Sequence, residues 1–145
     1  MRIEITRLDP VLPLPAQQHD HDAGYDLHAR IDARLEPGGG RVLVPTGLAV
    51  AIPPGCAGLV LPRSGLALRH GVSCLNTPGL IDPLYRGELK VLLVNTDPSE
   101  AYDVHRGDRI AQLVVTQVAS DIEWAEVDTL DDTSRDTFGF GSTGR

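Results

Sequence analysis

The most informative chemical groups of this sequence lie in the run PRSGL at residues 62–66, where an arginine, a hydroxyl and a glycine are adjacent. Arg63 supplies a fixed positive charge, and Gly65 lets a ligand approach the backbone closely. Ser64 is placed to cap a short helix over residues 65–70, and the free N–H groups of a helix start favour an anion. The run predicts a phosphate contact, but a capped helix with a surface arginine would have the same sequence.

A second group of polar side chains lies in residues 76–91, whose two turn signals predict a hairpin. Asp82 stands between an apolar pair and a proline, a setting that holds a carboxylate stiffly. The same residue type also serves in turns, where it accepts hydrogen bonds from backbone N–H groups. Tyr85, taken alone, is more typical of a core residue than of a ligand contact.

A third motif, RGDRIAQL at residues 106–113, reads as a turn that leads into a strand. Alternation along the strand predicts that Ile110 and Gln112 lie on one face. A glutamine on a buried face needs hydrogen-bond partners. Gln112 is therefore interpreted either as a contact to a water or phosphate oxygen, or as a structural residue.

Residues 131–145 are polar and glycine-rich without periodicity, which predicts an arm that is mobile unless a ligand orders it. The arm carries Arg135, the aromatic ring of Phe140, and the hydroxyls of Ser142 and Thr143. With the exposed N–H groups of its glycines, this set suits a polyphosphate that bears a base.

Two other sets of potential metal ligands receive a plainer interpretation. The run HDHD at residues 19–22 is more typical of a solvated loop than of a metal site. Cys56 and Cys74 form no CxxC pair and lie among apolar residues, so they are interpreted as buried free thiols rather than zinc ligands.

The composition favours an all-β fold in one domain over residues 1–145. Hydrophobic residues make up 41% of the chain, which is enough for a core at this size. The 15 glycines and 11 prolines disfavour long helices and predict short strands joined by turns. This pattern is typical of a jelly-roll-like β-barrel. The expected strands fall within residues 2–8, 27–35, 42–44, 48–52, 58–61, 89–95 and 109–118.

The charge and hydropathy exclude two classes of partner. The net charge is −7 and no basic run is present, so non-specific nucleic-acid binding is not expected. No run approaches the roughly 20 apolar residues of a membrane span, and the first residues lack an apolar signal region. We expect a cytoplasmic protein that binds an anion through a local site.

The four segments, together with AGYDLHA at residues 23–29, resemble the five ordered motifs of trimeric dUTPases. The resemblance extends from about residue 23 to residue 144. It implies a β-rich jelly roll that forms a homotrimer with active sites between subunits. It also implies Mg²⁺-dependent hydrolysis of dUTP to dUMP and pyrophosphate, by in-line attack of water on the α-phosphorus. Such a reaction supplies dUMP for thymidylate synthesis and keeps uracil out of DNA.

The resemblance assigns a role to each motif residue. Asp82 orients the attacking water and contacts the 3′-hydroxyl, Tyr85 packs under the deoxyribose, and Gln112 acts beside the reacting phosphate. Asp26 acts through water on a magnesium ion that the substrate phosphates mainly hold. The other implied contacts are Asn76, Leu80, Ile81 and Lys90 at the uracil edge, Arg63, Ser64, Gly65 and Gln112 at the phosphates, and Arg135, Phe140, Gly141, Ser142 and Thr143 from the arm.

Three positions depart from the family pattern, which usually has glycine where this chain has Leu84, Asp136 and Phe138. The last two lie in the arm, so we expect an arm that is stiffer than usual.

Two other activities fit the same scaffold. A dCTP deaminase shares the fold but uses a glutamate where this chain has Leu92, and an aliphatic side chain cannot transfer a proton. A catalytically inactive nucleotide-binding protein is the second alternative. The intact set of Asp82, Arg63 and Gln112 argues against it.

Overall fold

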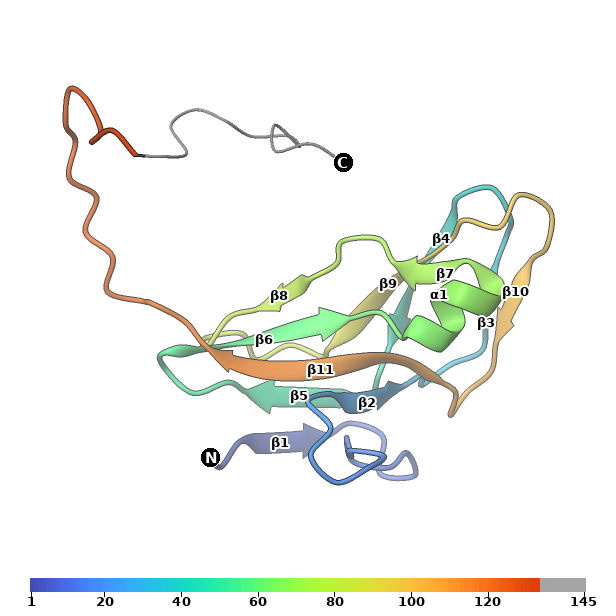
Figure 1. Ribbon diagram of the computed structural model, residues 1–145. Coiled ribbons are helices and arrows are strands. Elements are labelled where there is room, and N and C mark those ends of the chain that lie inside the picture. The colour runs from blue at the N-terminus through green and yellow to red at the C-terminus, as the bar shows by residue number, and fades with distance from the viewer. Residues whose placement is uncertain (134–145) are drawn as a thin grey trace.

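The computed structural model describes residues 1–133, which form eleven strands and one short helix (Figure 1). The all-β prediction is confirmed. The elements are β1 (Glu4–Arg7), β2 (Tyr25–His28), β3 (Ala33–Leu35), β4 (Gly40–Pro45), β5 (Leu48–Ala51), β6 (Cys56–Leu61), α1 (Ser64–His70), β7 (Val72–Cys74), β8 (Gly79–Ile81), β9 (Lys90–Asn95), β10 (Tyr102–Val104) and β11 (Arg109–Gln117).

The strands pair antiparallel in four small sheets. The largest has the order β2-β11-β6-β8, so that β11 and β6 lie at its centre. A second sheet has the order β4-β9-β7, and the pairs β1-β5 and β10-β3 complete the fold. Non-consecutive strands are therefore neighbours throughout, as expected for a jelly-roll-like chain path.

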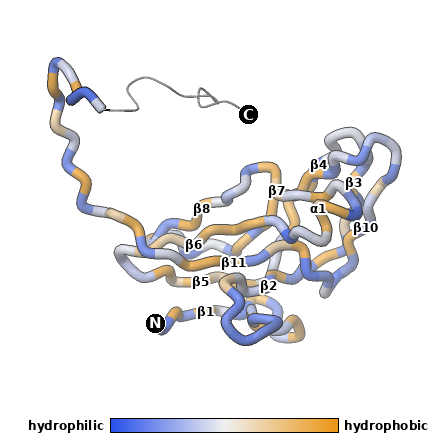
Figure 2. The backbone as a smooth tube through the Cα atoms, viewed as in Figure 1, coloured by the Kyte–Doolittle hydropathy of each residue, from blue (hydrophilic) through white to orange (hydrophobic). Residues whose placement is uncertain are grey.

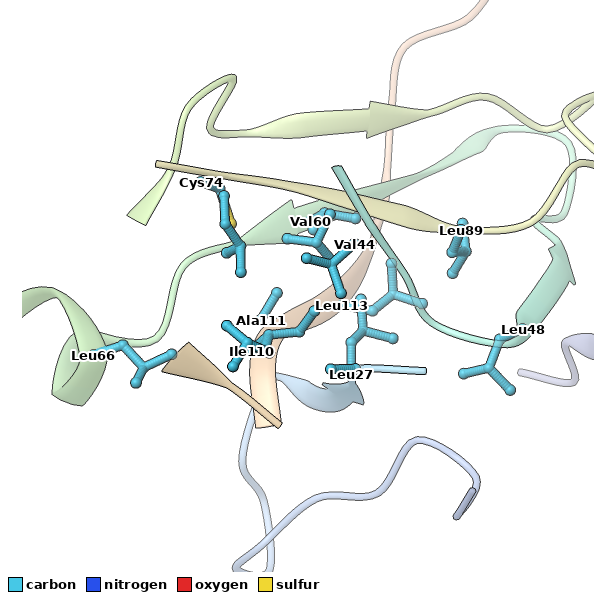
Figure 3. Packing of buried hydrophobic residues seen from close by; sticks show 14 of the residues in the cluster. Leu27, Val44, Leu48, Val60, Leu66, Cys74, Leu89, Ile110, Ala111 and Leu113 are labelled. Carbon is cyan, nitrogen blue, oxygen red and sulfur yellow. The ribbon is translucent and has the colours of Figure 1, made fainter. Parts of the chain in front are cut away.

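The sheets enclose one apolar core. Leu27, Val60 and Leu113 extend from the four-stranded sheet toward Val44 and Leu89, as the close-up shows (Figure 3). Each such side chain contributes about 1.5–3 kcal/mol when it is fully buried. Hydrophobic residues follow the strands, whereas the loop between β1 and β2 is mostly hydrophilic (Figure 2). Cys56 and Cys74 are buried free thiols, as predicted.

The sequence-based strand assignments are wrong in one place and incomplete in others. The expected strand over residues 27–35 is two strands, β2 and β3, which belong to different sheets. The chain leaves the sheet at Ala29 and Arg30, whose N–H groups donate to the carbonyls of Asp108 and Pro45. A run of suitable residues does not reveal where the hydrogen-bonding partner changes. The sequence also left three strands of three residues unrecognised, namely β7, β8 and β10.

The segment 76–91 is not a hairpin. Its first strand, β8, pairs with β6, and its second, β9, pairs with β4 and β7. The segment thus crosses from one sheet to the other. Turn residues mark where a chain reverses, but they do not fix which strand becomes the neighbour.

The short helix was correctly predicted at its end but not at its start. Gly71 adopts the left-handed conformation at φ 64°, and its N–H donates to the Ala67 carbonyl. Ser64 is the first helical residue, and Arg63 occupies the N-cap position without a capping hydrogen bond from its side chain. In residues 1–133, no helix is long and apolar enough to cross a membrane.

Candidate active site

A cleft of about 640 Å³ lies on the outer face of the four-stranded sheet and brings together three of the predicted motifs. Arg63, Ser64 and Gly65 follow β6, Gln112 lies on the central strand β11, and Asp26 lies on β2. Gln112 pairs with Asp26 on one side and with Leu61, two residues before Arg63, on the other. The strand order explains how residues far apart in the sequence reach one cleft.

Asp26 is the electrostatic centre of this cleft. Its side chain is only 10% exposed, and its Oδ1 lies 3.4 Å from Nε of Arg63. Arg109 Nη1 donates to its Oδ2 at 3.1 Å. Arg63 is fixed further because its Nη1 donates to the Arg109 carbonyl at 3.0 Å. One carboxylate therefore holds two arginines at the wall of the cleft, so that part of their charge remains for a bound anion.

Gln112 faces this cleft rather than the core. The predicted shared face with Ile110 is wrong, because the register of β11 against β2 shifts between Arg109 and Ala111. This bulge turns both Ile110 and Ala111 into the core and leaves Gln112 outside. Gln112 Nε2 donates to the Pro62 carbonyl at 3.0 Å.

Gly24 sets the position of the glutamine from the other side. A Cβ on Gly24 would lie 2.1 Å from Oε1 of Gln112. Only a residue without a side chain fits at this point while the glutamine keeps its place.

His28 lies next to this cluster, on the strand that carries Asp26. Its Nδ1 is buried and has no hydrogen-bond partner among the described residues. Burial lowers the pKa of His28, and the nearby Asp26 opposes this shift. The ring is thus favoured in its neutral form and adds no third cation beside the two arginines.

The residues of segment 76–91 lie outside this cleft, on and beyond β8. Asp82 and Tyr85 are exposed, and Leu80 and Leu84 are 61% and 89% exposed. Tyr85 is held locally, because its hydroxyl donates to the Glu88 carbonyl at 3.0 Å. Its ring covers Gly87, where an added Cβ would lie 2.6 Å from the ring carbon Cζ.

The other predicted residues of this segment share its exposed position. Asn76 and Lys90 are exposed, Leu80 lies on β8, and Ile81 is half-buried against the core. The structure therefore separates the predicted phosphate residues from the predicted nucleoside residues within one chain.

A row of apolar side chains crosses the outer face of the sheet beside the cleft. Val114 pairs with Leu59, and Leu59 pairs with Leu80. Their neighbours along the strands, Val60 and Leu113, belong to the core, so the row points the other way. Apolar residues that line an outer sheet face are typical of a surface that another molecule covers.

Sequence reasoning missed several residues of the cleft. Arg109 reaches Asp26 across 83 positions of sequence, a pairing for which no local signal exists. Gln18, His19 and Asp22 form a further wall, although the run HDHD was interpreted as a solvated loop. The predicted contacts Arg135, Phe140, Gly141, Ser142 and Thr143 lie outside the described residues.

A comparison with known families agrees with these motifs. A family model described as dUTPase matches residues 11–144. The chain belongs to the dUTPase family. Over 144 residues it is 54% identical to the deoxyuridine 5′-triphosphate nucleotidohydrolase of Rhodococcus erythropolis, which covers 99% of this chain and 87% of the relative.

Two solved structures of this family have the same fold. The dUTPase of Staphylococcus bacteriophage 80alpha, solved with dUpNHpp, has a TM-score of 0.85 and 26% identity over 99% of both chains. A mutant dUTPase from phage phi11 of S. aureus has a TM-score of 0.79 and 24% identity, over 91% of this chain and 100% of the phage chain. That structure describes the coordination of a structural Mg(II) ion.

Proposed function

We propose that this chain hydrolyses dUTP to dUMP and pyrophosphate, with the phosphates bound in the cleft of Arg63, Ser64, Gly65 and Gln112. One observation carries the proposal. Two arginines held by a single carboxylate stand in a cleft beside a hydroxyl, a glycine and an amide. Such a set matches the charge and the hydrogen-bond acceptors of a polyphosphate.

Hydrolysis requires an in-line water, a group that accepts its proton, and donors for the negative charge that spreads over the phosphate oxygens. We assign the proton acceptor to Asp82. Arg63, Ser64 and the backbone N–H of Gly65 stabilise the developing charge, and Gln112 contacts the phosphate under attack. Because Arg63 is already anchored to Asp26, it loses little further freedom when the substrate binds.

Magnesium is the proposed cofactor, carried mainly by the substrate phosphates. No cluster of three His, Cys, Asp or Glu side chains that would form a protein cage occurs within residues 1–133. This fits an ion that keeps several waters and takes phosphate oxygens. Asp26 lines the cleft and would accept hydrogen bonds from those waters. When bound, the ion neutralises phosphate charge.

We further propose a homotrimer whose sites lie between subunits. Ile81 pairs with Gly58, five positions before Arg63. Asp82 lies one residue further from Arg63 along this antiparallel pair. A strand rises about 3.3 Å per residue, so Asp82 and Arg63 of one chain stand roughly 20 Å apart. Phosphate residues and the proton acceptor must then come from different copies. The apolar row Val114, Leu59 and Leu80 supplies a surface for the neighbour.

The nucleoside would lie on the neighbouring copy. The uracil edge would be recognised by Asn76 and by the backbone of Leu80, Ile81 and Lys90. If these hydrogen-bonding groups are positioned for uracil, bound cytosine leaves one of them buried without a partner, which disfavours cytosine. Tyr85 would pack under the deoxyribose.

The arm would complete the site. We treat residues 1–145 as one domain with an arm over residues 131–145, whose Arg135, Ser142 and Thr143 close over the γ-phosphate. Gly141 would offer its N–H group, and Phe140 would stack on uracil. Closure excludes water and strengthens each charge contact. A cytoplasmic location and the absence of nucleic-acid partners stay predictions.

The test is pyrophosphate release from dUTP, dTTP, dCTP and UTP, measured side by side with magnesium. We expect release from dUTP alone. Ammonia release from dCTP would instead indicate a deaminase, and binding without release would indicate an inactive nucleotide-binding protein.

Asp82→Asn tests the assignment of the proton acceptor. We expect turnover to fall about 10²–10⁴-fold while nucleotide binding is kept. Asp103→Asn is the matched control, because it makes the same change at an exposed aspartate on β10. Asp103 forms an ion pair with Arg34 of β3. Near-normal hydrolysis by Asp82→Asn would remove Asp82 from this role.

A further inference from the structure

The loop between β1 and β2 lies at the β2 edge of the large sheet (Figure 1). Its base is closed because the Asp26 N–H donates to the Ala16 carbonyl at 3.0 Å. The excursion over residues 17–24 therefore starts and ends beside the carboxylate that organises the cleft. Gln18, His19 and Asp22 contribute one wall of the cleft, and Ser64 and Gly65 contribute another.

The loop is held in this shape by its own hydrogen bonds. The His19 N–H donates to Asp22 Oδ2 at 2.9 Å, and the Asp22 N–H donates to the His19 carbonyl at 3.2 Å. Gln17 Nε2 donates to the Asp22 carbonyl. These contacts fix the backbone of His19 but do not use its ring.

The imidazole of His19 is accordingly available to a ligand. Within residues 1–133 it makes no hydrogen bond or ion pair with another side chain or the backbone. His21, two residues later in the same run, is exposed and does not line the cleft. The two histidines thus have the same sequence context but different positions.

We infer that His19 is a further substrate-binding residue, whose ring N–H donates a hydrogen bond to an oxygen of the β- or γ-phosphate in the cleft. Asp22 is its positioning residue, because its carboxylate accepts from the His19 N–H and keeps the ring at the wall. The inference rests on the proposed function, since it places the triphosphate in this cleft. It adds a contact from the loop wall to those of Arg63, Ser64 and Gly65.

The cleft has room and charge for this contact. The two arginines that line the cleft, Arg63 and Arg109, are both held by Asp26. Asp22 adds a second carboxylate on the loop wall. A donor on the loop offsets the repulsion between this carboxylate and a phosphate, and a hydrogen bond to a charged group commonly contributes about tenfold or more in affinity.

The experiment measures the dissociation constants of dUpNHpp and dUMP for full-length His19→Ala and the unchanged chain, with magnesium. We expect dUpNHpp to bind about tenfold more weakly and dUMP to bind as before. His19→Gln retains a donor and should recover part of the loss. His21→Asn is the control, because asparagine tolerates the φ of 73° at this position, and it should bind both ligands normally.

Two results would overturn the inference. Unchanged affinity of His19→Ala for dUpNHpp would show that the ring makes no contact. An equal loss for dUpNHpp and dUMP would show that the residue acts through the fold. Inorganic tripolyphosphate separates this inference from the proposed function. If the unchanged chain does not hydrolyse dUTP, the proposed function fails, and weaker tripolyphosphate binding by His19→Ala still supports the contact.

Discussion

The cleft around Asp26 and the segment 76–91 differ in how they are built. The cleft is closed by contacts within the chain, with Arg63 and Arg109 on one carboxylate and Gln112 on the Pro62 carbonyl. The segment 76–91 leaves Asn76, Asp82, Tyr85 and Lys90 exposed. Its one fixed ring, Tyr85, contacts neighbouring residues of the same segment.

The difference indicates which half of the proposed site is preorganised. Charged groups require anchoring before an anion arrives, because unanchored arginines lose conformational freedom on binding. A nucleoside is recognised by shape and by hydrogen bonds to backbone groups. In the proposed homotrimer, the exposed segment 76–91 would provide these contacts once a neighbouring copy covers it. Four experiments break or sharpen this comparison.

The largest effect is expected from mixing two inactive variants. Asp82→Asn and Arg63→Ala should each lack activity, but mixed trimers combine an intact cleft with an intact Asp82 from different copies. Random exchange would restore up to about a quarter of the normal turnover. The measurement is pyrophosphate release after exchange, with trimer formation followed by differently tagged chains.

The control for this mixture is Arg63→Ala with Gln112→Ala. Both changes lie in the same cleft, and each chain carries one of them. Every cleft in a mixed trimer therefore lacks either Arg63 or Gln112. No activity should return. Absence of rescue in the first mixture, despite shown exchange, would contradict a site shared between copies.

The second effect concerns sugar selection by the exposed segment. Removing the ring with Tyr85→Ala should raise the rate on UTP relative to dUTP by about tenfold or more, because space for a 2′-hydroxyl opens. Tyr85→Phe keeps the ring and loses only the hydrogen bond to the Glu88 carbonyl. Unchanged selectivity in Tyr85→Ala would place the discrimination elsewhere.

The third effect tests the anchoring of the cleft. Asp26→Asn leaves Arg63 and Arg109 without their carboxylate and should lower the free energy of unfolding by about 1–3 kcal/mol. Triphosphate affinity should fall several-fold, while dUMP affinity changes less. Thermal unfolding and ligand titration measure both, with Asp103→Asn as the exposed control. If Asp26→Asn had the same free energy of unfolding and the same triphosphate affinity as the unchanged chain, the ion pairs would contribute to neither stability nor binding.

The smallest effect concerns Gly24. Gly24→Ala should push the Gln112 amide away from the Pro62 carbonyl, with a loss of about 1 kcal/mol in stability and a few-fold loss in turnover. In a Gln112→Ala background the same change should cost much less, because the clashing oxygen is gone and only the Cβ of residue 112, at 3.2 Å, remains close. Equal losses in both backgrounds would locate the strain in the backbone of Gly24.

The sequence was sufficient for features that depend on residues near one another. The turn at Gly71, the all-β composition and the grouping of Arg63, Ser64 and Gly65 are local properties, since backbone conformation and hydropathy are set by neighbouring residues. The resemblance of five ordered motifs identified the family for the same reason, because each motif is a short run of adjacent functional residues.

What only the tertiary structure decided depends on pairing across the sheet. The bulge that turns Gln112 outward, the carboxylate shared by Arg63 and Arg109, and the placement of His19 in the cleft all arise from contacts between distant segments. The separate sheets of β8 and β9 have the same origin. Every strand presents the same backbone N–H and C=O groups to a partner. The sequence of a strand therefore does not determine which other strand pairs with it. The packing of the whole core selects that neighbour and thereby positions the site.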